Sequence, residues 1–112
     1  MIYQTRELLA MKLELESYLG NKALEEYYLA LPKSFRKNSP WLERDLKRVQ
    51  QNIKFIEQQI ARLPDKERTF LYDVYINKNS KKEIMKKYGL SNSSYHRNLD
   101  KAVYAFTRVN DE

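Results

Sequence analysis

The sequence predicts an all-α protein, with an N-terminal helical hairpin or coiled coil followed by a C-terminal group of short helices. Three observations predict this class. Apolar residues recur at helical spacing along most of the chain, three helix starts carry capping sequences, and no stretch alternates apolar and polar residues as a strand would. With 42% hydrophobic residues but only two Gly and three Pro in 112 residues, the composition is that of a folded helical protein rather than a disordered chain.

We expect residues 1–63 to form the N-terminal region. Its first helix has an apolar face at helical spacing, made by Leu8, Met11, Leu15 and Tyr18 or Leu19. Leu9 and Leu13 are expected to widen this face. Gly20-Asn21 predicts a break, after which a second short helix would end before Pro32.

A long helix is predicted over residues 40–63. Ser39-Pro40 supplies a cap and a proline at the first helical position, where its missing N–H costs nothing, and Pro64 disfavours helical geometry in the residue before it. Residues 33–38, which precede this helix, are expected to form a solvated basic loop, with contact to phosphates as the alternative. The helix carries apolar residues spaced 4-3-4-3-4-3, namely Leu42, Leu46, Val49, Ile53, Ile56, Ile60 and Leu63.

This heptad seam predicts that the long helix pairs with another helix. In one alternative two chains pair as a homodimer, and the oligomerisation residues are Leu42, Leu46, Val49, Ile53, Ile56 and Ile60. In the other the seam packs inside the chain against the N-terminal helix. The charges that flank the seam do not choose between the two.

Residues 64–112 carry the start and stop signals of two further helices. Ser80 and Glu83 form a capping box, so a helix should begin at Lys81, and Gly89 stands where a left-handed residue would end it. Ser91 can then cap a third helix, reaching about residue 108. The buried stripe of that helix is predicted to be Tyr95, Leu99, Ala102, Val103 and Phe106. A helix followed by two capped helices around a glycine turn is typical of a DNA-binding helix-turn-helix.

The outward face of the third helix is the candidate recognition surface. With its apolar stripe inward, a rotation of about 100° per residue turns Ser93, Arg97 and Asp100 outward, with Asn92 and His96 beside them. In this motif the first turns of the helix enter the major groove. Arg97 would bind guanine O6 and N7, Asn92 would pair with adenine, and Ser93 or His96 would contact a base edge or a phosphate.

The residues around this face are strongly basic. Between positions 78 and 101 there are seven basic residues and two acidic ones, and residues 32–63 form a second basic region with eight and three, in a chain of net charge +6. Lys78, Lys87 and the lysines of the predicted site would contact phosphates. The candidate DNA-binding residues are Ser80, Lys81, Lys82, Lys86, Asn92, Ser93, Ser94, His96, Arg97 and Lys101. As an alternative, Asn92, Ser93 and Ser94 are only the polar start of a helix, since Ser and Asn favour that location for local hydrogen bonding.

A family resemblance covers residues 63–102. This stretch resembles the promoter-reading fourth region of bacterial sigma factors, whose pattern runs LP-x-x-ER, S-x-x-EIA, LG-x-S-x-x-TV and L-x-RA. The matching positions are Leu63-Pro64, Glu67-Arg68, Leu71, Tyr75, Ser80, Glu83-Ile84, Gly89-Leu90-Ser91, Ser94, Leu99 and Lys101-Ala102. Met85, Tyr88 and Ser94-Tyr95 depart from it. Together with the separate N-terminal helices, the chain resembles the sigma-like late-gene activators of Gram-positive phages, of the ArpU and RinA kind.

This resemblance implies a sequence-specific DNA-binding transcription regulator, an activator of phage or mobile-element late genes, with double-stranded DNA and RNA polymerase as partners. One alternative is a sigma-like protein-interaction module that binds RNA polymerase or another regulator. Another is a DNA-packaging component of the small-terminase type. DNA binding that falls steeply as salt rises would favour the regulator over the protein-interaction module, which would not bind DNA even at low salt. Ring-sized assemblies would favour the packaging component.

Other function classes find little support in the sequence. There is no glycine-rich phosphate loop and no nucleophile at a usable spacing from a base, so we expect no enzyme. The chain has one His and no Cys, so no second ligand of these types could complete a metal site, and we expect neither a metal nor another cofactor. The absence of cysteine fits a reducing cytoplasm, where we expect the protein to act, and no apolar run approaches the roughly twenty residues that span a bilayer.

Overall fold

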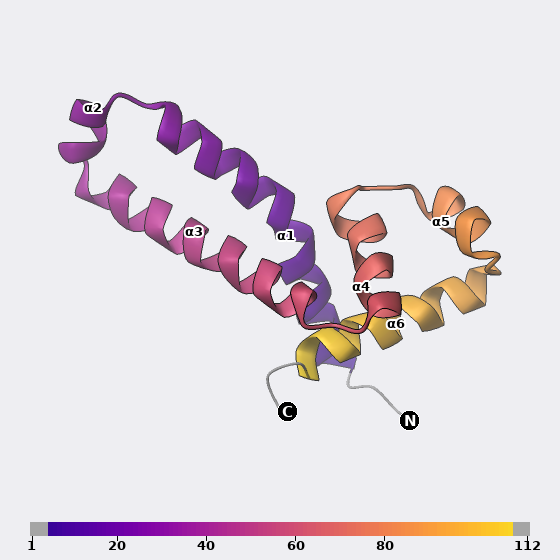
Figure 1. The fold of residues 1–112 in the computed structure, drawn as a ribbon. Coiled ribbons are helices and arrows are strands. Elements are labelled where there is room, and N and C mark those ends of the chain that lie inside the picture. The colour runs from indigo at the N-terminus through magenta and orange to yellow at the C-terminus, as the bar shows by residue number, and fades with distance from the viewer. Residues whose placement is uncertain (1–4, 109–112) are drawn as a thin grey trace.

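The computed structural model describes residues 5–108, which form helices and short connections (Figure 1). No strand occurs among these residues, which confirms the all-α class. In chain order the elements are α1 (Thr5–Ala30), α2 (Lys33–Lys37), α3 (Pro40–Ala61), α4 (Asp65–Leu71), the π-helical turn η1 (Tyr72–Ile76), α5 (Lys81–Tyr88) and α6 (Asn92–Arg108).

Helices α1 and α3 pack side by side as a long hairpin, with α2 at its far end (Figure 1). All seven residues of the predicted heptad seam are buried. Two hydrogen bonds flank the interface: the Tyr18 hydroxyl donates to Glu57 (2.6 Å) and the Tyr28 hydroxyl donates to Asp45 (2.5 Å). The seam therefore packs inside the chain. Pairing of two chains through the same seam stays a prediction that would require α1 to leave α3.

The predicted break at Gly20-Asn21 is wrong, because α1 continues through both residues to Ala30. A glycine inside a helix costs about 1 kcal/mol relative to alanine. Buried contacts lie on both sides of it, at Leu15 and Tyr18 before and at Tyr28 after, so packing against α3 and the rest of the core outweighs this cost.

Two further expectations in this region are corrected. Leu9 and Leu13 do not widen the buried face of α1, since their exposed fractions are 58% and 59%. Residues 33–37 form a short helix rather than a loop, with the N–H of Arg36 donating to the carbonyl of Pro32 (3.2 Å). Pro32 can begin such a turn because it supplies the acceptor without needing its own donor satisfied.

The C-terminal unit, residues 65–108, consists of α4, η1, α5 and α6. It lies at the base of the hairpin, where α1 contacts both η1 and α6 (Figure 1). One core cluster continues from Leu8 and Leu15 of α1 through Ile60 of α3 to Ile84 and Phe106. The hairpin and the C-terminal unit thus share a hydrophobic core across the connection at Leu63-Pro64.

Candidate nucleic-acid interface

Helix α5 begins and ends at the predicted residues. The Ser80 hydroxyl oxygen accepts from the N–H of Glu83, and the N–H of Ser80 donates to the Glu83 carboxylate, both at 3.1 Å. Donation by the Ser80 backbone N–H also lowers the pKa of Glu83 from its ordinary value. Gly89 ends the helix with φ 64° and ψ 43°, a left-handed conformation that glycine adopts without a Cβ penalty. The predicted capping box and glycine stop are confirmed.

Helix α6 also follows its prediction. The Ser91 hydroxyl oxygen accepts from the N–H of Ser94 (3.2 Å), and the helix runs from Asn92 to Arg108. Its buried residues are the predicted stripe of Tyr95, Leu99, Ala102, Val103 and Phe106. The opposite side of its first turns is consequently turned to solvent.

Most of the predicted DNA-binding residues are on the surface of the C-terminal unit. Ser94 is half-buried, and the exposed members are Ser80, Lys81, Lys82, Lys86, Asn92, Ser93, His96, Arg97 and Lys101. Lys81 joins α5 to α6, because its ammonium lies 3.2 Å from His96 Nε2 and 5.6 Å from the centre of the Tyr95 ring. Arg97 donates to the Ser94 hydroxyl at 3.2 Å.

Asp100 is only partly exposed, because it pairs with another helix, whereas the prediction turned it outward with Ser93 and Arg97. Its carboxylate pairs with the Lys12 ammonium of α1 at 2.7 Å, and the side chain is only 36% exposed. Helix α1 packs against α6, and its Lys12 lies on the flank where Asp100 is. Helical rotation alone cannot predict this, because the partner comes from the other end of the chain.

Sequence reasoning missed Asp73, a buried carboxylate with 4% exposure in η1. Its oxygens accept from the Tyr88 hydroxyl, the Lys87 ammonium (2.9 Å) and the Asn77 amide (3.3 Å). Burial alone would raise the pKa of Asp73, but these three donors together hold it below its ordinary value. The only signal in the sequence is a single acid within the apolar run FLYDVYI.

Asp73 attaches α5 to the rest of the fold. Lys87 is thereby paired with a carboxylate while its side chain stays 53% exposed, and its contact with phosphate stays a prediction. Tyr88, one of the departures from the sigma pattern, also packs on Phe70 with ring centres 5.5 Å apart. Burial and the Asp73 hydrogen bond raise the pKa of Tyr88 to about 12, so its hydroxyl stays a donor at neutral pH.

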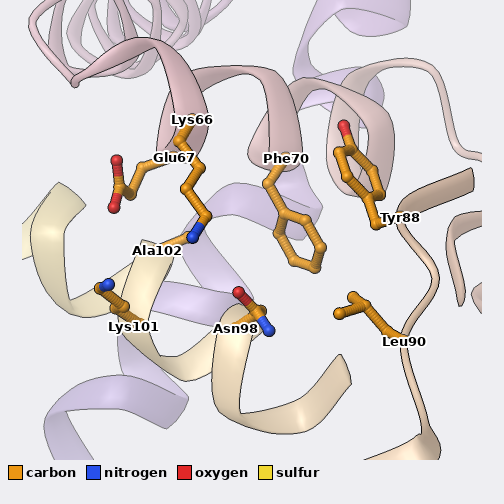
Figure 2. Close-up of a pocket in the computed structure, with 8 residues that line it drawn as sticks. All are labelled: Lys66, Glu67, Phe70, Tyr88, Leu90, Asn98, Lys101 and Ala102. Atoms are coloured by element: carbon orange, nitrogen blue, oxygen red, sulfur yellow. The ribbon is translucent and has the colours of Figure 1, made fainter. Parts of the chain in front are cut away.

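A pocket of about 240 Å³ lies between α4, the end of α5 and α6 (Figure 2). Phe70, Tyr88 and Leu90 line its apolar part, and Lys66 and Lys101 lie at its polar side. Lys101, predicted to contact DNA, therefore lies beside α4, although it follows Arg97 by one helical turn. The pocket is smaller than the roughly 300–1,000 Å³ usual for ligand sites.

Within residues 5–108 no group of His, Cys, Asp and Glu side chains is arranged to hold a metal ion. In the same part of the chain, no helix combines the length and the apolar character needed to cross a membrane.

The fold and this surface define a small all-α protein whose C-terminal helices present an exposed polar and basic face. The sequence model of the family described as "Protein of unknown function (DUF1492)" matches residues 37–107, from the end of α2 almost to the end of α6. The match covers more than half of the chain, so the chain belongs to this family. No curated protein and no solved structure matches it.

Proposed function

We propose that this protein is a sequence-specific DNA-binding transcription regulator that inserts the first turns of α6 into a major groove. The observation that carries the proposal is the exposure of Ser93, His96 and Arg97 on one side of α6, directly after the turn that joins it to α5. A recognition helix needs its N-terminal residues uncovered in this way, while its opposite side is anchored in the core.

The side chains on this face suit the chemistry of base recognition. The guanidinium of Arg97 can donate two parallel hydrogen bonds to guanine O6 and N7, and the amide of Asn92 can both donate to and accept from adenine. Arg97 now donates to Ser94, a neutral partner that costs little to exchange for a base. Donation to Ser94 keeps the Arg97 guanidinium beside the first turn of α6, which supports the proposed role.

The charges of α5 suit contact with the phosphate backbone. Lys82 and Lys86 are exposed and lie four residues apart, on one side of the helix. Such contacts fix the register on the duplex and release counterions, but they read no sequence. The hydrogen bonds at Asp73 hold α5 in place and thereby set the position of these lysines relative to α6.

The resemblance to sigma region four narrows the proposal to a helix-turn-helix that activates late genes of a phage or mobile element, with RNA polymerase as its protein partner in the cytoplasm. The capping box at Ser80 and the turn at Gly89 are positions that this chain shares with the sigma pattern. Among the described residues, the long α1–α3 hairpin precedes the part that resembles sigma.

The test is selection of bound sequences from random duplexes at physiological salt, followed by affinity measurements on the selected site over a range of salt concentrations. We expect one enriched motif and a logarithmic affinity that falls with the logarithm of salt by about 0.9 per phosphate contact. If no motif is enriched and no duplex binds at low salt, the proposal is wrong and the protein-interaction alternative stands.

Matched lysine variants sharpen this test. Lys82→Ala and Lys86→Ala should each weaken binding on all sequences and reduce the salt slope by about one contact. Lys47→Ala and Lys54→Ala, at exposed positions of α3, are the controls and should leave the slope unchanged. Equal effects from all four variants would indicate nonspecific attraction to the whole basic surface instead of docking through α5 and α6.

A further inference from the structure

Helix α1 exposes three large apolar or aromatic residues on the side that α3 does not cover. Leu9, Leu13 and Tyr27 are exposed by 58%, 59% and 62%, although each is a large apolar or aromatic side chain. Glu16, Gly20 and Ala23 lie between them and are exposed as well. We refer to these six residues as the outer stripe.

The outer stripe has the spacing of a coiled-coil seam. Its members follow one another at intervals of 4, 3, 4, 3 and 4 residues, a heptad spacing that keeps one side of a helix facing a partner helix. Single exposed leucines are common on protein surfaces. Three such residues at heptad positions of one helix, Leu9, Leu13 and Tyr27, are a stronger signal, because the buried face of α1 already accounts for its packing on α3.

The outer stripe is flat at Gly20 and Ala23. A Cβ placed on Gly20 would meet no atom within 4 Å, and Ala23 adds only a methyl group. Small residues in a seam let two helices approach closely, and they leave room for a larger side chain from the opposite helix. The large apolar and aromatic members lie toward the two ends of the stripe, at Leu9, Leu13 and Tyr27.

We propose that the outer stripe binds the same stripe of a second copy of this chain, in antiparallel orientation. The two-fold axis lies at the height of position 18, on the side of α1 opposite the buried Tyr18 side chain. The stripe is complementary to itself about that point. Reversed, it sets Leu9 opposite the partner's Tyr27, Leu13 opposite the partner's Ala23 and Glu16 opposite the partner's Gly20. Each small residue thus lies opposite a longer side chain of the partner. A two-fold interface uses the same surface twice and needs such self-complementarity.

A parallel pair fits less well. It would place the two Glu16 carboxylates level with each other, where they repel. It would also place the two Gly20 residues face to face, which leaves an unfilled gap. In the antiparallel pair the methylenes of Glu16 cover Gly20, and the carboxylate extends to the solvent at the edge. This contact leaves the α1–α3 seam intact and does not depend on DNA binding.

The first test is sedimentation equilibrium of the full chain. We expect a concentration-dependent dimer that Leu13→Glu weakens at least about tenfold, because the two-fold axis places the new charge in the interface twice. Leu29→Glu is the matched control: Leu29 is also an exposed leucine of α1 (49%) but lies outside the stripe, so its dimer should be unchanged. A monomeric wild type, or equal effects of both variants, would overturn the proposal.

A misfolded variant could also lose the dimer, so a second variant is chosen that should strengthen dimerisation. Glu16→Leu removes the only charge of the outer stripe and should tighten the dimer about tenfold, while circular dichroism of each variant should keep the wild-type helical spectrum. A weaker or unchanged dimer in Glu16→Leu would contradict a contact through this side of α1.

The orientation can be tested by disulfide formation, since the chain has no cysteine of its own. When Leu13→Cys and Ala23→Cys proteins are mixed and oxidised, the antiparallel arrangement predicts a mixed disulfide between the two variants. Two copies of Leu13 would be separated by about 15 Å along the axis, too far for a disulfide. Efficient oxidation of either variant with itself, without the mixed product, would overturn the antiparallel arrangement.

Discussion

The hairpin and the C-terminal unit are stabilised in different ways. The hairpin has two long helices joined by a regular apolar seam, and its tyrosine–carboxylate hydrogen bonds, such as Tyr28 to Asp45, lie at the margin. The C-terminal unit has helices α4 and α5 of seven and eight residues, too short to be stable alone, and it buries a carboxylate at Asp73. Apolar repetition therefore holds the hairpin, whereas caps and specific polar contacts hold the unit with the proposed recognition helix.

One place where the two regions meet is the C-terminal half of α6. Phe106 is fully buried there, with its ring centre 6.3 Å from that of Phe55 of α3. The buried Gln59 of α3 donates to the carbonyl of Phe106 at 3.4 Å. The difference between the regions is thus one of local stabilisation within a continuous core.

The largest effect is expected where the regions meet. Phe106→Ala should lower the free energy of unfolding by about 3–5 kcal/mol, because it leaves a cavity that the hairpin and the C-terminal unit both line. Denaturant titration followed by circular dichroism measures this loss. Phe35→Ala is the control, since Phe35 is half-exposed on α2, and it should change stability by no more than about 0.5 kcal/mol. Similar losses from both variants would contradict a shared core.

The buried carboxylate gives the next effect. Asp73→Ala should cost about 1.5–3 kcal/mol, because it leaves the donors of Tyr88, Lys87 and Asn77 without their acceptor. Asp45→Ala removes the corresponding carboxylate of the hairpin and should cost less, since its partners can bond to water. The same titration compares the two variants. If Asp45→Ala is the more harmful, the contrast between the regions is wrong.

The pH dependence should show the same contrast. The pKa of Asp73 is lowered in the folded protein, so its contribution to stability is present above the unfolded value of about 3.9 and is lost as the pH falls through the folded value. Asp73→Asn should reduce the loss of stability on acidification, measured by urea unfolding between about pH 6 and pH 2. An unchanged acid profile in this variant would show that Asp73 contributes nothing through its charge.

The smallest effect is expected for the ion pair between the regions. Lys12→Ala should cost no more than about 1 kcal/mol, because Lys12 and Asp100 are both partly solvated. Lys54→Ala, an exposed lysine of α3, serves as the control in the same unfolding experiment. A loss as large as that of Phe106→Ala would mean that the ion pair, and not the core, holds the regions together.

The sequence predicted what depends on local signals. The buried seam of α3, the cap at Ser80, the stop at Gly89 and the buried stripe of α6 all follow from spacing or from a short motif. The continuity of α1 through Gly20 did not follow, because packing against α3 decides it. Periodicity within one helix shows which side is apolar but not which other helix covers it.

The candidate site was predictable to the same extent. Rotation about α6 correctly placed Ser93 and Arg97 on the surface, but it failed for Asp100, which pairs with Lys12 far away in the sequence. The hydrogen bonds of Asp73 also join segments that come together only in the fold. The sequence therefore predicts the exposed residues better than the contacts that hold them in position.

The proposed reading of DNA bases by the exposed side of α6 depends above all on Arg97. Binding of wild type, Arg97→Ala and the control Arg44→Ala should be measured on the selected duplex and on its single-base variants. We predict that Arg97→Ala loses about 1–3 kcal/mol on the selected duplex and stops discriminating at one base pair, while Arg44→Ala matches wild type. An equal loss on every duplex, or no loss at all, would contradict base recognition by α6.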